Sequence, residues 1–378
     1  MRSNYKVIGD YIKQVKGKNT AHMVTAENLK GININKYFMP SVANIIGTDL
    51  SKYKIVQKNQ FSCNRMHVGR DYRLPIAVSS FDYDIIVSPA YDVFEIKDIT
   101  KLLPEYLMMW FLRSEFDRNS WFYTDSDVRG RLGWQDFCAM QLPIPSLEKQ
   151  REIVKEYQTI TDRIKLNEGL NKKLEDTAQS IYKEWFVNFE SQEKIKLDKY
   201  IEFNPKHTIN KKQITSYVEM ADVQEDSMSL RNIIQRHFTS GSKFKNKDIL
   251  LARITPCLEN GKTAFVTGLE TSEVAYGSTE FIVMRAKKDI SPYWIYCLAR
   301  EDNFRSYAIS SMIGSSGRQR VHSDYLKEYE VSVNIEKMYN FNIAVKPIFD
   351  MIDIKTKENK NLVVLAKILL SKMATIKG

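Results

Sequence analysis

Two long stretches of the chain carry apolar residues at intervals that alternate between four and three. The first stretch follows an extended, proline-rich segment at 142–145 and a candidate helix N-cap at Ser146. Its stripe consists of Ile153, Tyr157, Ile160, Ile164, Asn167, Asn171, Leu174, Ala178, Ile181 and Trp185. The second stripe consists of Phe341, Val345, Ile348, Ile352, Lys355, Asn359, Leu362, Ala366, Leu369 and Met373. This spacing predicts the contact faces, or seams, of two helices in a coiled coil, each with a polar patch at its centre.

The two stretches belong to an internal repeat that covers nearly the whole chain. A shift of about 188 residues places the second stripe on the first and Pro292 on Pro104. With a slip of one residue, Gly317-Arg318 falls on Gly130-Arg131. Two copies of one unit tend to be related by a two-fold axis, so we expect the helices to run antiparallel. Asn167 would then lie opposite Asn359, and Asn171 opposite Lys355. The alternative is that each stripe is only the buried face of a globular helix.

The remaining sequence predicts two globular domains of mixed α+β structure. Short β-rich runs at 83–87, 93–96, 249–251 and 281–284 alternate with predicted helices at 104–116 and 292–304, each with a proline in its first turn. We therefore expect domains at 1–145 and 191–334, with helices at 146–190 and 335–378. The seam of the first helix would span about 50 Å, so the helices would serve as a spacer.

Composition narrows the class of partner. The net charge is +10, which suits a polyanion, and the hydrophobic content of 43% is ample for packed cores. The four cysteines are scattered without a CxxC pair, which argues against a zinc site and against a disulfide framework. No signal sequence is evident, and no apolar run approaches the ~18 residues that span a bilayer. We expect a cytoplasmic protein with no membrane contact.

Glycine- and arginine-containing loops occupy matching places in the two copies. Glycine lets a backbone approach a partner closely, arginine binds guanine or phosphate, and glutamine binds adenine. A solvated loop is the alternative for each segment. The candidate DNA-binding residues are Arg129, Arg131, Trp134 and Gln135 in the first copy and Ser316, Gly317, Arg318, Gln319 and Arg320 in the second, with Arg253 and Lys262 as weaker candidates.

No catalytic or metal-binding residue is predicted. Gly261-Lys262-Thr263 resembles the end of a phosphate-binding loop, but Pro256 stands where that motif requires glycine. The histidines have no metal-ligand spacing. One alternative remains, because Asp84 followed by Glu95 and Lys97 fits the loose pattern of magnesium-dependent nucleases. A plain strand with alternating charges explains the same residues.

Several segments resemble the specificity subunits of type I restriction-modification systems. In the first copy these are 142–153 (LPIPSLEKQREI) and 178–190 (AQSIYKEWFVNFE). In the second copy they are 248–253 (DILLAR) and 317–321 (GRQRV). The start of the second helix departs most, because 336–340 (EKMYN) replaces the Glu-x-Gln-x-x-Ile pattern of 148–153.

The resemblance implies a DNA-recognition subunit without catalytic activity of its own. Each globular domain would be a target-recognition domain that reads half of a split site in double-stranded DNA, and the helices would set the gap. The helices would also dock two methyltransferase subunits that use S-adenosylmethionine to methylate adenine at N6. The sequence leaves open whether two motor-nuclease subunits, which require ATP and Mg²⁺, also join. The alternatives are a nuclease built on Asp84, Glu95 and Lys97, and a coiled-coil scaffold that binds no DNA.

Overall fold

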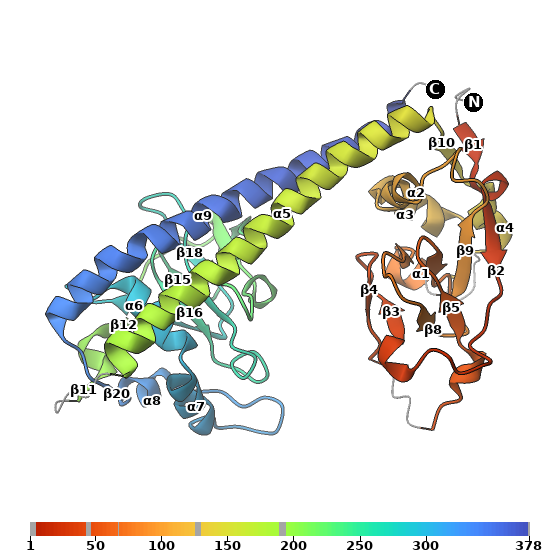
Figure 1. The fold of residues 1–378 in the computed structure, drawn as a ribbon. Coiled ribbons are helices and arrows are strands. Elements are labelled where there is room, and N and C mark those ends of the chain that lie inside the picture. The colour runs from red at the N-terminus through yellow and green to blue at the C-terminus, as the bar shows by residue number, and fades with distance from the viewer. Residues whose placement is uncertain (1–4, 43–46, 67, 125–129, 189–193, 377–378) are drawn as a thin grey trace. The chain divides into compact units, whose positions relative to one another are not determined.

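The structure is a computed structural model that describes residues 5–42, 47–66, 68–124, 130–188 and 194–376. The chain forms two compact units. Unit 1 comprises the described residues up to Asp162 together with those from Leu362 onward, and unit 2 comprises Arg163–Asn361. Two long helices, α5 (Leu147–Tyr182) and α9 (Ile335–Lys372), therefore contribute one part to each unit (Figure 1).

Unit 1 is built around an antiparallel sheet with the strand order β2-β9-β6-β7. Its strands in chain order are β1 (Tyr5–Val7), β2 (Ile12–Val15), β3 (Lys30–Ile32), β4 (Phe38–Pro40), β5 (Lys54–Val56), β6 (Phe61–Cys63), β7 (Ile76–Val78), β8 (Ile85–Val87), β9 (Asp92–Ile96) and β10 (Gln141–Pro143). Its helices, besides its part of the long pair, are α1 (Val68–Asp71), α2 (Pro104–Phe111), α3 (Ser114–Phe122) and α4 (Trp134–Ala139). Aromatic rings from β6, β9 and α2 fill the core, where Phe61 stacks on Phe94 at 5.0 Å.

Unit 2 repeats this arrangement. The matching sheet has the order β12-β19-β16-β17. A second sheet with the order β14-β13-β18-β15 is larger than the two-stranded sheets β3-β4 and β5-β8 of unit 1. The strands are β11 (Ile195–Lys196), β12 (Ile201–Phe203), β13 (Ile214–Val218), β14 (Ile234–His237), β15 (Ser242–Phe244), β16 (Ile249–Ala252), β17 (Thr263–Phe265), β18 (Ala275–Gly277), β19 (Phe281–Ala286) and β20 (Glu330–Val331). The helices, besides its part of the long pair, are α6 (Pro292–Arg300), α7 (Asp302–Ser310) and α8 (Ser323–Lys327), and a short π-helix at Lys183–Val187 follows α5.

The repeat also extends to the strand pairs that close each unit. In unit 1, β1 pairs with β10, the strand just before α5. In unit 2, β11 pairs with β20, the strand just before α9. Each globular part is thus closed by its own first and last strands, and a long helix leaves from the same point in both. The helices and sheets confirm the predicted mixture of α and β structure.

Two of the predicted helices are wrong in extent, because each is two helices. The predicted helix at 104–116 breaks between α2 and α3, where Arg113 adopts an extended backbone (φ −74°, ψ 139°). The predicted helix at 292–304 breaks at the equivalent Glu301 (φ −75°, ψ 138°), whose carboxylate accepts a hydrogen bond from the backbone of Phe304. An extended residue starts a second helix at both breaks, without glycine or proline, and a side-chain cap supports the break at Glu301. The strand predicted at 83–87 is also shorter, since β8 begins at Ile85.

The positions of the predicted seam are buried or half-buried throughout both long helices. In unit 1, Ile153 near the start of α5 and Met373, just after the end of α9, lie in the same core. In unit 2, Tyr182 contacts Phe341 with ring centroids 6.4 Å apart. Residue numbers along α9 fall as those along α5 rise, from the Asn167–Asn359 contact to the Tyr182–Phe341 contact. The two helices therefore run antiparallel within unit 2.

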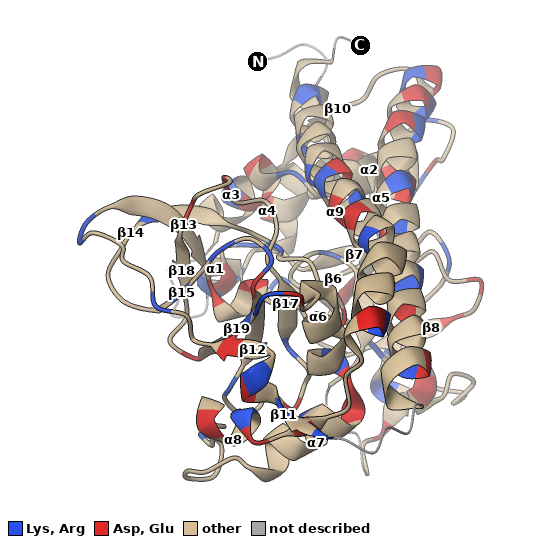
Figure 2. Cartoon of the chain, turned by 90° about the vertical axis from the view of Figure 1, so that its left-hand side faces the viewer, with Lys and Arg blue, Asp and Glu red and all other residues tan. Residues whose placement is uncertain are grey.

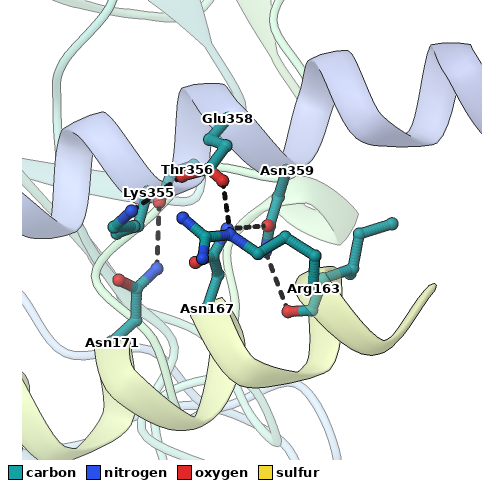
Figure 3. Close-up of polar contacts among 8 residues, drawn as sticks. Arg163, Asn167, Asn171, Lys355, Thr356, Glu358 and Asn359 are labelled. Carbon is teal, nitrogen blue, oxygen red and sulfur yellow. Dashed lines mark hydrogen bonds and ion pairs between the residues drawn. The ribbon is translucent and has the colours of Figure 1, made fainter. Parts of the chain in front are cut away.

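The polar centre of the seam is a hydrogen-bonded cluster in unit 2 (Figure 3). Asn167 Nδ2 donates to Asn359 Oδ1 at 2.8 Å. The expected pairing of Asn171 with Lys355 is replaced by a contact with the next residue, since Asn171 Nδ2 lies 3.4 Å from Thr356 Oγ1. Lys355 instead binds Glu358 at 2.8 Å. A flexible lysine side chain reaches a carboxylate on its own helix, which leaves the threonine hydroxyl to the amide.

Candidate nucleic-acid interface

Two of the predicted DNA-binding segments of unit 2 lie side by side. Val321 N donates to Arg253 O at 2.9 Å, and Thr255 N donates to Gln319 O at 3.1 Å. Ile313 and Arg320 also exchange two backbone hydrogen bonds, of 3.0 and 2.9 Å, which close a short loop between them. Strand-like pairing thus fixes the ends of the loop and brings the segment that follows β16 next to it.

The tip of this loop is open to solvent. Ser316, Gly317 and Arg318 are exposed, and a Cβ atom on Gly317 would meet nothing within 4 Å. The backbone of Gly317 has φ +75°, in the left-handed region that favours glycine. In the part of the chain that the structure describes, the Arg318 side chain has no hydrogen bond or ion pair. The tip therefore presents a cationic side chain on a tightly turned backbone.

Arg320 is held beside the loop by a carboxylate. Its guanidinium binds Glu280 with a closest contact of 2.8 Å, and Nη1 donates to Arg318 O at 3.0 Å. The hydrogen bonds from Arg320 to Glu280 raise the pKa of Arg320 above its usual value. The pair is partly exposed, so a phosphate oxygen can compete with Glu280 for the guanidinium.

The other three candidates of unit 2 are half-buried and differ in the contacts that they make. Lys262 is half-buried, and its Nζ donates a hydrogen bond of 3.1 Å to the backbone carbonyl of Met220. Arg253 is also half-buried, and its Nε is a buried atom that lacks a hydrogen-bond partner among the described residues. Gln319 is half-buried, with its backbone paired to Thr255.

Unit 1 has the same pairing of segments with different side chains. Leu132 N donates to Arg65 O at 3.0 Å, the counterpart of the contact between Val321 and Arg253. Arg131 and Gln135 are exposed, whereas Arg129 lies outside the described residues. Gly130 packs directly on Gly69, where an added Cβ would lie 2.4 Å from the Gly69 Cα. This glycine allows two backbones to touch, so it has a packing role.

Trp134, another candidate DNA-binding residue, lies against the core of unit 1. Its ring is half-buried and packs on Phe94 and Phe137, with centroids 5.8 and 5.3 Å apart. The guanidinium of Arg65 lies 5.5 Å from the same ring. The Trp134 side chain therefore packs at the edge of the hydrophobic core of unit 1.

An acidic residue at the same place in each unit binds an arginine, but the two arginines are not at equivalent positions of the repeat. In unit 1, Asp92 binds Arg65 at 2.7 Å. In unit 2, the equivalent Glu280 binds Arg320, although Arg253 is the residue that matches Arg65. Sequence reasoning missed Arg65, Asp92 and Glu280. The repeat offset contained the signal, because it aligns Arg65 with Arg253 and Asp92 with Glu280.

The residues of the nuclease alternative make separate contacts. Asp84 accepts a hydrogen bond from Gln57 at 3.4 Å, and Glu95 binds Lys13 and Gln60 at 2.9 and 2.8 Å. Lys97 Nζ donates to the backbone carbonyls of Gly9 and Asp10. Across the described residues, no group of three or more His, Cys, Asp or Glu side chains is placed to hold a metal ion.

Charge is mixed along the long helices. Figure 2 shows Lys and Arg residues interspersed with Asp and Glu on α5 and α9. None of the helices within the described ranges is long and apolar enough to span a bilayer.

Comparisons with known proteins give relatives in sequence and in structure, although no family model matches. The chain is 39% identical over 79 residues to the specificity subunit of the type I restriction enzyme EcoAI of Escherichia coli, a match covering 21% of this chain and 13% of the relative. It is 24% identical over 160 residues to the HindI specificity subunit of Haemophilus influenzae, covering 41% of this chain and 34% of the relative. The matched segments thus span well under half of either relative.

The likeness in structure extends over nearly the entire chain. A crystal structure of the S subunit of a type I restriction-modification system from M. genitalium aligns with 99% of this chain and 96% of its own, with a TM-score of 0.56 and 14% identity. In segments of its sequence and in its fold, this chain therefore resembles the specificity subunits of type I restriction-modification systems.

Proposed function

We propose that the chain is the DNA-recognition subunit of a type I restriction-modification complex. The observation that carries the proposal is the duplication of one globular unit within the chain. Each unit has a sheet of the same strand order, and each pairs an arginine-bearing segment with a glycine-arginine segment at the corresponding place. The likeness in sequence to specificity subunits supports the same conclusion.

Two DNA-binding domains in one chain would match a DNA site that consists of two separated half-sites. The domains at 1–145 and 191–334 would each read one half-site, and the helices at 146–190 and 335–378 would form an antiparallel coiled coil that sets the gap. The polar cluster at Asn167 and Asn359 supports this role, since a buried polar pair fixes the alignment of two helices. A fixed distance between the two domains would allow two weak interactions with DNA to combine into one strong, selective interaction.

The exposed side chains of the paired segments supply the contacts. Arg318 and Arg131 would reach base edges or phosphates, with Ser316 and Gln135 as hydrogen-bonding partners. Arg320 would lie beside the phosphates, with its guanidinium still held by Glu280. Arg253 would contribute from beneath the loop, where its Nε has no partner among the described residues.

All chemistry in this proposal belongs to partner subunits in the cytoplasm. Two methyltransferase subunits would dock on the long helices and methylate adenine with S-adenosylmethionine. Two motor-nuclease subunits, with ATP and Mg²⁺, are further candidate partners. This chain would hold no cofactor and perform no catalysis.

Selection of bound DNA tests the proposal. The chain, assembled with its methyltransferase partner, would be incubated with random duplexes at two salt concentrations, and the bound DNA sequenced. We expect enrichment of a split motif with a fixed gap, and an affinity that falls steeply with salt. Retention without sequence enrichment would contradict the proposal, and no retention would favour the scaffold alternative. Cleavage by the chain alone with Mg²⁺, lost in Lys97→Ala, would favour the nuclease alternative.

A further inference from the structure

The end of α3 and Tyr72, the residue that follows α1, together expose four large aromatic side chains in unit 1. Trp121, Phe122 and Tyr123 are 48%, 79% and 50% exposed, and Tyr72 beside them is 62% exposed. The rings form two edge-on pairs, with Tyr72–Trp121 centroids 5.3 Å apart and Phe122–Tyr123 centroids 5.4 Å apart. We name these four residues the aromatic patch. Clustered apolar surface of this kind marks a binding site more often than single exposed residues do.

The fold does not require the aromatic patch. The equivalent helix of unit 2, α7, ends instead with Ile309, Ser310 and Ser311. The hydroxyls of Ser310 and Ser311 donate to Tyr307 O, each at 2.8 Å. Unit 2 thus builds the same sheet and helix pair without aromatic residues at these three positions.

Three arginines lie within three residues of the aromatic patch in the chain. Tyr72 lies between Arg70 and Arg73 in the chain, and Arg118 lies one helical turn before Trp121. The side chains of Arg70 and Arg118 are 65% and 69% exposed, and their ion pairs are with close neighbours in sequence, Asp71 and Glu115. Exposed pairs of this kind contribute little, so phosphates can replace the carboxylates.

The aromatic patch adjoins the candidate DNA-binding segment of unit 1. Thr124, which follows Tyr123, forms a β-bridge with Leu132, and Leu132 follows the exposed Arg131. A duplex lying on Arg131 would therefore pass close to the aromatic rings. Rings interleaved with arginines suit nucleic acid, since rings bind base faces or wedge between base steps while guanidinium groups bind phosphates.

We propose that the aromatic patch contacts double-stranded DNA by wedging into a base step at the edge of the half-site read by unit 1. Phe122, the most exposed ring, enters the step, and Arg70, Arg73 and Arg118 hold the flanking phosphates. Unit 2 lacks these rings, so the two half-sites are bound differently and only one is unstacked. This inference rests on the proposed function.

The test replaces the rings at the end of α3 with the residues that unit 2 has at the same places. The variant is Trp121→Ile, Phe122→Ser and Tyr123→Ser, and the control is Tyr37→Ser, which removes a 52% exposed ring elsewhere in unit 1. Both would be assembled with the methyltransferase partner. The DNA would be the selected duplex with 2-aminopurine placed at successive steps, because its fluorescence rises when a base is unstacked.

We expect the wild type and Tyr37→Ser to raise fluorescence at one step near the half-site of unit 1. The triple variant should lose that signal and bind the duplex about 10-fold more weakly. A mismatch at the same step should strengthen binding by the wild type, because unstacking then costs less, and should not strengthen binding by the variant.

Three other results would overturn the inference. Unchanged fluorescence and affinity in the triple variant would overturn it while leaving the proposed function intact, provided that the wild type still binds selectively. Loss of the methyltransferase subunit from the variant complex, measured by its mass, would show that the aromatic patch binds protein instead. Absence of selective binding by the wild type would overturn both the inference and the proposed function.

Discussion

The side-chain amide of Asn167 donates to the side-chain oxygen of Asn359 at 2.8 Å, in the middle of the contact between α5 and α9 in unit 2. Asn359 in turn places its own Nδ2 3.4 Å from the Ile164 carbonyl. Asn167 is only 3% exposed, so loss of its hydrogen-bond partner would destabilise the folded protein.

Removing one member of this pair should destabilise the protein, whereas replacing both should not. We expect Asn167→Ala to lower the free energy of unfolding by about 1–3 kcal/mol, because the half-buried Asn359 amide is left with one partner fewer. Asn167→Leu combined with Asn359→Leu should be at least as stable as the wild type. Urea denaturation measures both, with Lys360→Ala on the exposed surface of α9 as the control. A double variant less stable than the single one would contradict this account.

Acid should loosen the same part of unit 2. Hydrogen bonds from Arg163, at 2.6 Å, and from Lys355 lower the pKa of Glu358 from 4.5 to about 2. A carboxyl whose pKa falls on folding stabilises the folded state above its unfolded pKa, and that stabilisation is lost as the pH falls. We expect this contribution to disappear between pH 4.5 and about 2. Glu358→Gln should flatten the pH dependence of the melting temperature in this range. An identical profile for the wild type and the variant would exclude this role.

Releasing Arg320 should change how DNA binding responds to salt. Glu280→Gln weakens the ion pair that holds the guanidinium, so Arg320 should gain a phosphate contact. We expect the slope of log affinity against log salt to steepen by about 0.9, the value for one more neutralised phosphate. Glu259→Gln removes an exposed negative charge from the same unit and is the control.

Adding Arg320→Ala to the Glu280 variant should abolish the steepening, since the released cation is then absent. If Glu280→Gln and Glu259→Gln change the slope equally, the effect is one of net charge and Arg320 does not reach the DNA.

A matched deletion tests the helices as a spacer. Removing 160–166 from α5 and 360–366 from α9 takes one heptad from each helix and preserves the seam spacing. The helices would shorten by about 10 Å, which corresponds to about three base pairs. We expect the gap of the selected motif to shorten while both half-sites keep their sequences. Half-sites that change in sequence would contradict separate roles for readers and spacer.

The long helices could be predicted from sequence because their apolar spacing is regular over many turns. The repeat then predicted corresponding places in the globular parts, and the paired segments at Arg65 and Arg253 lie at such places. Periodicity gave the seam and its polar centre. It could not choose between Lys355 and Thr356 as the partner of Asn171, since both lie near the same helix face.

Details within each unit depend on contacts between residues distant in sequence. The helix breaks occur at the extended residues Arg113 and Glu301, which leave no glycine or proline signal, and only Glu301 caps the following helix with its side chain. Trp134 is drawn into the core by Phe94 and Phe137, which no local pattern reveals. The choice of Arg320 over Arg253 by Glu280 depends on the path of the loop that closes at Ile313.

Mapping of N6-methyladenine tests the central claim most directly. DNA would be compared from host cells that make the methyltransferase partner with this chain, and from cells that make the partner alone. The account predicts methylation at one two-part motif only when the chain is present, and a change in just one half of the motif when one globular domain is exchanged. The same methylated positions with and without the chain would contradict it.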